Sequence, residues 1–331
     1  MTAAEHVVIG GAGFIGSAVC RQLAQDHEVM VLDDLSTGHR ANVDVEGVRL
    51  RVGSILDEDA LREVLRDARV VYHLACLGVR HSIHAPRANH EVNAEGTLRV
   101  LEAARSLGVE RVVYTSTSEV YGSALSTPIT ESHPTFPHTV YGAAKLAGEA
   151  YARAYHRTYD LATVVIRPFN AYGPRSHHEG DSGEVIPRFL VRAMNGLAPV
   201  IFGNGTQARD FTYVEDTARA IIAAGAAPDV EGTTINVANG RSISITELAD
   251  VVLRATGRGD LVPSYVDERP GDVHTLLGSN DRARELLGWR PEVSLHEGVA
   301  QLLAWHKAEG TEWDRALAEM VERNWVAEVE R

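Results

Sequence analysis

The stretch HVVIGGAGFIG, residues 6–16, leads from a β-branched run into a glycine-rich turn. Gly10, Gly13 and Gly16 suit a tight turn, a close approach of the backbone to a pyrophosphate, and packing of the next helix on the strand. The spacing is GxxGxxG rather than the GxGxxG of the common dinucleotide-binding turn. Asp33 ends the next β-branched run about 20 residues after the central glycine, where a carboxylate can hold ribose hydroxyls and repel a 2′-phosphate. The stretch therefore predicts a turn that binds NAD rather than NADP.

The first half of the chain alternates short β-branched runs with helix-length amphipathic segments. The runs are HVVIG (6–10), EVMVLDD (28–34), RLRVGS (49–54), RVVYHLA (69–75), RVVYTST (111–117) and ATVVIRPFN (162–170). Helix-length segments between them include 60–67, 97–107 and 143–159. Runs that are almost continuously apolar are typical of strands buried on both faces, and their alternation with helices predicts a parallel sheet. We therefore expect an α/β fold with a Rossmann-type, doubly wound parallel sheet.

The pattern changes after about residue 175, where long polar loops appear. We expect residues 1–175 to form the NAD-binding domain, together with a return segment at about 209–235. Residues 176–208 and 236–331 would form a smaller, discontinuous C-terminal lobe that binds the substrate. Within that lobe, Ser244 and Glu247 predict a capping box at the start of a helix. The tail from about residue 310 predicts one amphipathic surface helix.

The composition is that of an ordinary globular chain, with 331 residues, 44% hydrophobic and 23% charged, and a formal net charge of −13. This acidity argues against a broad nucleic-acid or anionic-membrane surface, although arginines can still gather in a cleft. Cys20 and Cys76 stand in apolar context, which predicts no disulfide and fits a reduced cytosol. The chain start does not look like a signal peptide, and no window reaches about 18 uninterrupted apolar residues. We expect a cytoplasmic protein that binds neither membrane nor nucleic acid.

Tyr141 and Lys145 stand four residues apart in YGAAK (141–145), so they lie one above the other on a helix. Ionising a phenol at pH 7 costs about 4 kcal/mol. A lysine ammonium about 4 Å away returns a similar amount at an effective dielectric of about 20, and an oxidised nicotinamide ring adds a second positive charge. Tyr141 is therefore a candidate general base. Thr117, at the strand end in YTSTSEVYG (114–122), can hydrogen-bond the same substrate hydroxyl.

Together these motifs resemble the extended short-chain dehydrogenases, and among them the NAD-dependent nucleotide-sugar epimerases and dehydratases. The resemblance covers about residues 5–308. It rests on GGAGFIG (10–16), Asp33, YHLA (72–75), NAEGT (93–97), STSEVYG (116–122), YGAAK (141–145), RPFNAYGPR (167–175), GNGTQARDFTYVED (203–216) and LGWRP (287–291). It implies bound NAD, no metal, and a nucleotide-sugar substrate for which uridine is the default base.

The resemblance also implies roles by position. Tyr141 would be the base, Lys145 would hold the nicotinamide ribose and lower the tyrosine pKa, and Thr117 would be the hydroxyl partner. Ser118 and Glu119 complete the expected catalytic set. The expected cofactor contacts are Gly10, Gly13, Phe14, Ile15, Asp33, Ser54, Ile55, Leu74, Ala75, Asn93, Tyr141 and Lys145. Ser54 and Ile55 stand where the family usually has an acid that contacts adenine.

The expected substrate contacts follow from the same resemblance. Asn170 would hydrogen-bond the nucleotide diphosphate, and Asp272 would face the nucleotide ribose. Arg209 and Arg269 would clamp the phosphates, a task that suits the guanidinium fork. Arg80, in LGVRHSIHAP (77–86), either binds a sugar carboxylate if the substrate is a uronate or is an ordinary surface arginine.

The segment after Thr117 bears on the sugar chemistry. Dehydratases that act at C4 and C6 usually carry an aspartate where this chain has Ser118, and serine is a poor proton donor for expelling water. The triplet Thr117–Ser118–Glu119 resembles UDP-glucuronate decarboxylases and also occurs in some 4-epimerases, so Glu119 is either catalytic or structural. LGVRHSIHAP and YGAAK resemble the epimerases.

The histidines do not predict a metal site. His73, His81, His84, His90, His177 and His178 occur without an H-E-x-x-H motif or paired cysteines. The segment SHHEGDSGE (176–184) is predicted to form a loop over the sugar, where a histidine selects substrate by hydrogen bonding.

We therefore predict an NAD-dependent nucleotide-sugar 4-epimerase that acts through a transient 4-keto sugar on a UDP-hexose, a UDP-N-acetylhexosamine or a UDP-uronate. The alternatives are a UDP-glucuronate decarboxylase or sugar-nucleotide dehydratase that uses Glu119, and a non-catalytic NAD-sensing regulator. The presence of both Tyr141 and Lys145 disfavours the regulator. The resemblance further implies a homodimer that packs helices at about 88–107 and 140–157.

Overall fold

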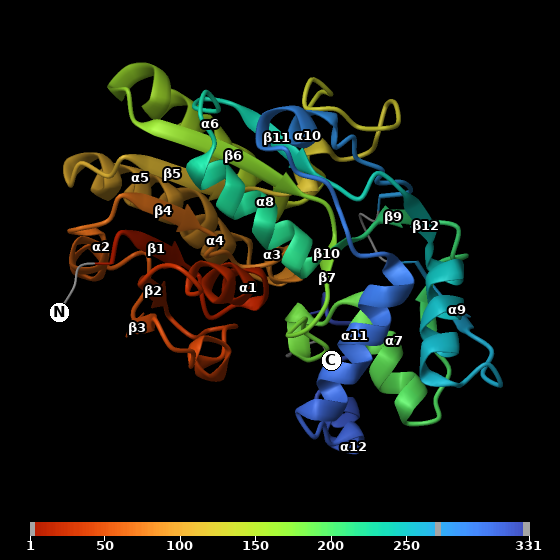
Figure 1. Ribbon diagram of the computed structural model, residues 1–331. Helices are drawn as coiled ribbons and strands as arrows, with labels where there is room; N and C mark the ends of the chain where they lie inside the picture. Colours follow the sequence, from red (N-terminus) through yellow and green to blue (C-terminus); the bar gives the residue numbers. More distant parts are fainter. Residues whose placement is uncertain (1–3, 269–272, 327–331) are drawn as a thin grey trace.

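The computed structural model describes residues 4–268 and 273–326, and its main element is a seven-stranded sheet (Figure 1). The strand order is β11-β6-β5-β4-β1-β2-β3, and every neighbouring pair is parallel. The strands are β1 (His6–Ile9), β2 (Val29–Asp33), β3 (Val48–Val52), β4 (Val70–His73), β5 (Arg111–Thr115), β6 (Ala162–Pro168) and β11 (Thr234–Val237). Five of the six predicted runs contain one of these strands, the run 49–54 overlaps β3 from its second residue, and β11 adds a seventh strand. The predicted fold class is confirmed.

Helices cover both faces of this sheet, and each face has its own apolar core. On one face α1 (Phe14–Leu23) packs beside α8 (Val214–Ala226), and α10 (Asp281–Leu287) adjoins α8. The other face carries α2 (Glu58–Leu65), α5 (Gly96–Ser106) and α6 (Val140–Tyr159). Burial of the sheet on both sides explains why its strands are almost continuously apolar in sequence.

Shorter elements connect the main strands and helices. They are α3 (Val79–His84), α4 (Pro86–His90), a π-helical turn (Glu91–Glu95), 3₁₀ turns at Arg40–Val43, Ser118–Tyr121 and Gly180–Ser182, and the strands β7 (Ala171–Tyr172) and β10 (Thr212–Tyr213). Because β1 pairs with β2 on one side and with β4 on the other, the chain reverses its direction of travel across the sheet at this point. Ligands of such sheets bind beyond the carboxyl ends of the strands at this reversal.

A second group of helices lies beside the sheet, with its own apolar core (Figure 1). It comprises α7 (Val185–Met194), α9 (Ile245–Thr256), α11 (Leu295–Ala308), α12 (Trp313–Ala318) and the strands β8 (Val200–Phe202), β9 (Ala208–Asp210), β12 (Ser242–Ser244) and β13 (Ser264–Val266). The predicted capping box is present, because the Ser244 hydroxyl accepts from the Glu247 amide at 3.2 Å and the Glu247 carboxylate accepts from the Ser244 amide at 3.0 Å. The division into two lobes at the predicted boundaries stays a prediction.

The prediction of one surface helix for the tail is wrong. Helix α12 ends at Ala318, after six residues, and the chain then turns inward. The Arg188 guanidinium donates to the carbonyls of Val321 at 2.9 Å and Glu322 at 3.0 Å, and the buried Asn324 donates to the Gly183 carbonyl at 3.1 Å. These bonds to α7 and to the loop before it, both distant in sequence, replace the intrahelical bonds that the local pattern predicted.

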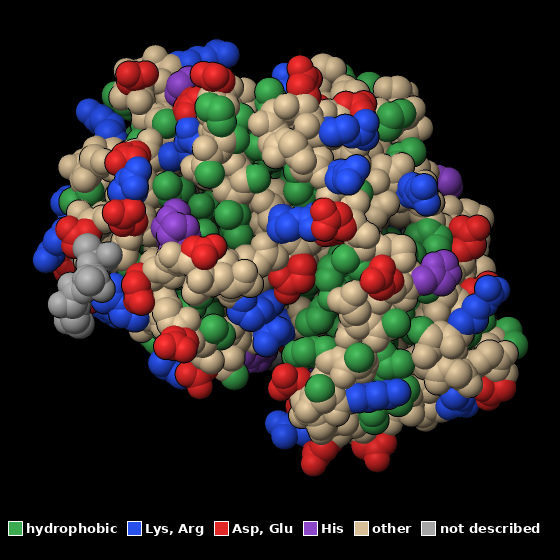
Figure 2. Space-filling view, viewed as in Figure 1, with side chains coloured by type: hydrophobic (Ala, Val, Ile, Leu, Met, Phe, Trp, Pro, Cys, Tyr) green, Lys and Arg blue, Asp and Glu red, His purple; other side chains and the backbone are tan. Residues whose placement is uncertain are grey.

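The outer surface mixes charges of both signs. Figure 2 shows Lys and Arg side chains interspersed with Asp and Glu on the face drawn. Among residues 4–268 and 273–326, no helix combines the length and the apolar character needed to cross a bilayer.

Candidate active site

A cleft of about 1450 Å³ lies beyond the carboxyl ends of the central strands. One wall comes from the sheet and from α6, and the other comes from the loop at residues 176–184, from β8 and from the tail. This position, at the reversal between β1 and β4, is where a parallel sheet of this kind binds its ligand.

The glycine turn is packed so closely that side chains are excluded. Gly10 has φ +82°, and a Cβ atom there would lie 2.4 Å from the Ala75 nitrogen. A Cβ at Gly16 would lie 2.1 Å from the Gly10 oxygen. Helix α1 starts after Gly13 without a side-chain cap, so its first amides remain available to an anion. This cradle fits the pyrophosphate of a dinucleotide.

Asp33 lies at the edge of the cradle. Its carboxylate accepts from the Ala12 amide at 2.9 Å and from the Leu35 amide at 2.8 Å, which ties the loop after β2 to the glycine turn. Burial raises the pKa of Asp33, and these two backbone hydrogen bonds oppose the rise. Because each carboxylate oxygen has further acceptor capacity, the cleft-facing side of Asp33 fits ribose hydroxyls.

The other predicted cofactor residues divide into two groups. Phe14, Ile15, Ile55, Leu74 and Ala75 line the cleft with Gly10 and Gly13. Ser54 and Asn93 are not among the cleft-lining residues. The Ser54 hydroxyl accepts from the Leu56 amide at 3.2 Å, and Asn93 bonds both the amide and the carbonyl of Leu77 at 2.9 Å. The two side chains therefore shape loops beside the cleft.

The predicted catalytic residues gather on one wall. Thr117 follows β5, and Tyr141 and Lys145 lie on the first turns of α6, which begins after the Thr139 cap. A side-chain hydrogen bond joins Thr117 to Tyr141. Ser118 and Glu119 line the same cleft, and the Glu119 carboxylate is close enough to raise the pKa of Tyr141.

The protonation of Tyr141 differs from the simple expectation for a tyrosine–lysine pair. Burial raises the pKa of Tyr141 well above its ordinary value, Cys76 and Glu119 add to the rise, and the hydrogen bond with Thr117 opposes it. Burial also lowers the pKa of Lys145. Both groups are thus held towards their neutral forms in the protein alone, so a phenolate needs another positive charge, such as that of an oxidised nicotinamide.

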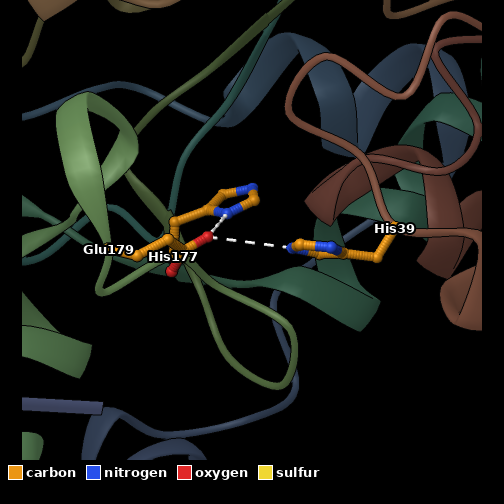
Figure 3. Close-up of side chains that lie close together, drawn as sticks. All are labelled: His39, His177 and Glu179. Atoms are coloured by element: carbon orange, nitrogen blue, oxygen red, sulfur yellow. Dashed lines mark hydrogen bonds and ion pairs between the residues drawn. The ribbon is translucent and has the colours of Figure 1, made fainter. Parts of the chain in front are cut away.

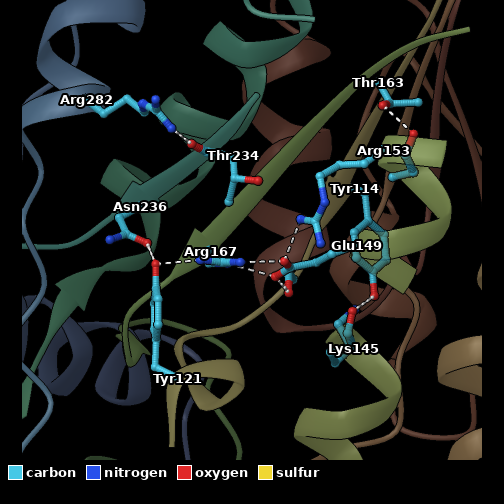
Figure 4. A network of polar contacts seen from close by, with 12 residues as sticks. Tyr114, Tyr121, Lys145, Glu149, Arg153, Thr163, Arg167, Thr234, Asn236 and Arg282 are labelled. Carbon is cyan, nitrogen blue, oxygen red and sulfur yellow. Dashed lines mark hydrogen bonds and ion pairs between the residues drawn. The ribbon is translucent and has the colours of Figure 1, made fainter. Parts of the chain in front are cut away.

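A buried network of polar side chains stands behind this wall (Figure 4). Glu149, one turn after Lys145, accepts two bonds from Arg167, at 2.8 and 2.6 Å, and one from the Ser116 hydroxyl at 2.6 Å. Ser116 directly precedes Thr117, so the network ties α6 to β5 and β6 at the height of the candidate catalytic groups. Arg167 also donates to the Tyr121 hydroxyl at 2.7 Å.

The predicted substrate contacts lie across the cleft where they can be described. Arg80, Asn170 and Arg209 all line it. The Asn170 amide donates to the Asp210 carbonyl at 3.1 Å, and the buried Arg209 donates to the Ala208 carbonyl at 2.9 Å. Arg269 and Asp272 lie outside the described residues.

Cys76 and Trp325 line the cleft although sequence reasoning did not place them there, and Glu184 lines it as the last residue of the loop predicted over the sugar. Cys76, just beyond β4, is within hydrogen-bond reach of the Tyr141 hydroxyl. Burial raises the pKa of Glu184 to about 7, against the opposing charges of His177 and Arg80. Trp325, from the tail, packs edge-on against Phe202 at 4.9 Å between ring centroids. Cys76 carried a usable signal because it follows a predicted strand at its carboxyl end, whereas the sequence of the tail gave none for Trp325.

Comparisons with known proteins agree with this geometry. Residues 6–238 match the model of the NAD dependent epimerase/dehydratase family. The chain is 39% identical over 304 residues to a UDP-glucose 4-epimerase of Mycolicibacterium smegmatis, and the match covers 89% of this chain and 96% of that protein.

Two solved structures are similar over nearly the whole chain. One is a UDP-N-acetylglucosamine 4-epimerase from Methanobrevibacter ruminantium in complex with UDP-N-acetylmuramic acid, with a TM-score of 0.88, 32% identity and coverage of 93% of this chain and 100% of that one. The other is DesIV, a dTDP-glucose 4,6-dehydratase from Streptomyces venezuelae with NAD bound, with a TM-score of 0.86, 34% identity and coverage of 94% and 99%.

Proposed function

Because the chain belongs to the NAD-dependent epimerase/dehydratase family, we propose that it is a nucleotide-sugar 4-epimerase that works with bound NAD through a transient 4-keto sugar. The observation that carries the proposal is the Thr117–Tyr141 hydrogen bond beside Lys145, in one cleft with the glycine turn. The names of the similar epimerases support a UDP-sugar as substrate.

The proposed reaction uses few groups of the chain. Bound NAD supplies a reversible hydride acceptor for C4 of the sugar. Tyr141 takes the proton of the C4 hydroxyl as the C4 hydride departs, and Thr117 orients that hydroxyl. After the 4-keto sugar turns about its diphosphate linkage, Tyr141 returns the proton when the hydride comes back to the opposite face. The net redox change is zero, so tightly held cofactor suffices.

Asn170 and Arg209 are the proposed diphosphate contacts among the described residues. A guanidinium that is buried beside the cleft suits a doubly charged diphosphate because its charge is little screened there. Glu184 lies close enough to Arg80 for their charges to interact, which offsets the attraction of Arg80 for a sugar carboxylate. We therefore expect a UDP-hexose or UDP-N-acetylhexosamine to turn over faster than a UDP-uronate.

The proposal is tested by incubating the NAD-loaded protein separately with UDP-glucose, UDP-N-acetylglucosamine and UDP-glucuronate. Mass spectrometry and NMR of the products should reveal a C4 isomer of unchanged mass. Tyr141→Phe should lower turnover by about 10²–10⁴-fold, since it removes a general base, and should retain NAD. Near-wild-type turnover in this variant would refute the assigned role of Tyr141.

A second function is favoured by one observation, the position of Glu119 in the cleft close to Tyr141. A decarboxylase or dehydratase would use this carboxylate on the 4-keto sugar, and its product would lack carbon dioxide or water. In an epimerase, Glu119→Gln should change turnover by less than about tenfold, whereas loss of a catalytic acid or base costs about 10²–10⁴-fold. The product mass and this variant together separate the two reactions.

We also propose a homodimer formed through the helices within 88–107 and 140–157. Helices α4, α5 and α6 lie against one another along this part of the chain, so one contiguous surface is available for a partner. Light scattering on the purified protein measures its mass directly. The free thiols of Cys20 and Cys76 fit our further proposal of a cytoplasmic location.

A further inference from the structure

Three metal-binding side chains meet at the mouth of the cleft (Figure 3). His39 comes from the loop after β2, and His177 and Glu179 come from the loop after β7. Figure 3 shows both imidazoles beside the Glu179 carboxylate, with a dashed line from one carboxylate oxygen to each ring. The loops belong to segments far apart in sequence, so neither one alone carries a metal-binding pattern.

From this arrangement we propose that His39, His177 and Glu179 bind one divalent transition-metal ion of the zinc class, which clips the two loops together across the mouth of the cleft. The site does not depend on the proposed reaction. It uses two imidazole nitrogens and one carboxylate oxygen, a donor set that suits zinc and leaves a fourth position for water.

The distances suit a site that needs little rearrangement. The Glu179 Oε1 atom lies 2.6 Å from His177 Nδ1 and 3.8 Å from His39 Nε2. One ligand atom of each residue lies within 4.8 Å of the other two. Ligands about 2.0–2.2 Å from a tetrahedral ion are roughly 3.4 Å apart. Widening the His177–Glu179 contact by less than about 1 Å and rotating His39, whose side chain is 64% exposed, would therefore complete the coordination shell.

The backbone around the three ligands is already held. The His39 amide donates to the Ala12 carbonyl at 3.0 Å, in the glycine turn. The His177 carbonyl accepts from the Glu184 amide at 2.7 Å. The second oxygen of Glu179 accepts from the His178 amide at 2.8 Å, which orients the carboxylate. Such outer contacts orient metal ligands and strengthen binding.

The local charge also favours a cation. The negative charge of the site comes from the Glu179 carboxylate, which contacts both imidazoles. Glu319 adds a second carboxylate, with Oε2 at 3.4 Å from His178 Nε2.

A hydrogen-bonded ion pair is the competing interpretation of the same three side chains. It needs only His177 and Glu179, whereas an ion requires His39 as well. His39 is therefore the residue that distinguishes the two interpretations. Because its backbone is bonded to the glycine turn, a metal clip at His39 would also hold the loop after β2 over the cofactor half of the cleft.

The test uses the full-length, tag-free, chelator-treated protein loaded with NAD. Titration calorimetry with Zn²⁺ should give one ion per chain, and Co²⁺ should give the visible absorption of a tetrahedral site. His39→Ala should weaken binding at least tenfold, and Glu179→Gln should do the same. His296→Ala, an exposed histidine on α11 outside the cleft lining, is the matched control and should bind as the wild type does.

The proposed metal link between the two loops is tested separately by measuring the rate of NAD release. Zn²⁺ should slow NAD dissociation from the wild-type protein and from His296→Ala, and should have no effect on His39→Ala. The site would be overturned if His39→Ala bound one Zn²⁺ ion as tightly as the wild type does. It would also be overturned if the wild type bound Zn²⁺ no better than the variant. Equal rates of NAD release with and without Zn²⁺ would overturn the clip.

Discussion

The two walls of the cleft are held in different ways. On the wall that carries Tyr141, Arg167 and Glu149 are 4% and 0% exposed and bond each other twice. On the opposite wall, loop 176–184 is held by pairs such as His178 with Glu319, whose side chains are 16% and 42% exposed. A buried ion pair has no water to replace a lost partner, so its two side chains are held in one arrangement. A partly exposed pair can separate and become hydrated at little cost in free energy. We infer that the first wall sets the chemistry and that the second opens to admit the sugar.

The largest effect should come from chemical modification of Cys76, which lies on the wall that carries Tyr141 and is reached through the cleft. Cys76 lines the cleft beside Tyr141, whereas Cys20 is fully buried and its pKa is raised by burial. Iodoacetamide should label Cys76 alone in the native protein and abolish turnover, because the adduct occupies the site of the sugar C4 atom.

Peptide mass spectrometry identifies the labelled cysteine, and the ratio of treated to untreated activity measures the loss. Cys76→Ala should keep most of its own activity after treatment, and saturating NAD with nucleotide sugar should protect the wild type. Labelling of Cys20 at a similar rate would mean that access through the cleft does not determine which thiol reacts.

A smaller effect should follow from breaking the buried network. Arg167→Met leaves Glu149 with too few partners inside the protein, and should lower the free energy of unfolding by about 3–5 kcal/mol. The matched control is Arg153→Met, which removes a single 3.0 Å bond to the same carboxylate from a side chain that is 32% exposed. That change should cost about 1 kcal/mol or less.

Urea unfolding followed by circular dichroism measures both variants. Equal losses for the two arginines would show that burial does not distinguish the walls. A loss confined to Arg167→Met would support the assignment of the network as the fixed part of the cleft.

The smallest effect should come from the second wall. Trp325 packs against Phe202 within the cleft lining, and an aromatic pair contributes about 0.5–1.5 kcal/mol beyond the area it buries. Trp325→Ala should therefore raise KM for the nucleotide sugar by about 2–12-fold and leave kcat unchanged. Leu125→Ala, at a side chain that is 72% exposed and outside the cleft lining, is the control. A fall in kcat with unchanged KM would mean that Trp325 acts in the chemical step and not in binding of the nucleotide sugar.

Local sequence patterns predicted the parts of the cleft that are local in the chain. The glycine turn is one strand-to-helix junction, and Tyr141 and Lys145 are one helical turn apart, so their relation follows from helix geometry alone. Asp33 follows from the same reasoning, because it ends the strand beside that turn. The family and the fold class were predicted correctly on these grounds.

Other parts depend on contacts between distant segments. Asn93 has a position in a motif, but its side chain bonds the Leu77 backbone beside the cleft. The tail has an amphipathic pattern, but the Arg188 guanidinium and the Gly183 carbonyl take up its polar groups after Ala318. In both cases a local pattern specifies which groups need partners and leaves open which partners they find.

Neighbouring residues in the chain were enough to specify the alternation of buried strands and helices, the turn for a dinucleotide, and the spacing of the tyrosine and lysine. These features depend on backbone geometry and on the spacing of apolar residues, and both are set by residues that are close together in the chain. Contacts between distant segments place Cys76 beside Tyr141, join Glu149 to Arg167 behind that wall, and bring His39 to Glu179. Such pairs form because folding brings separate segments to one edge of the sheet, where burial and charge select the partners.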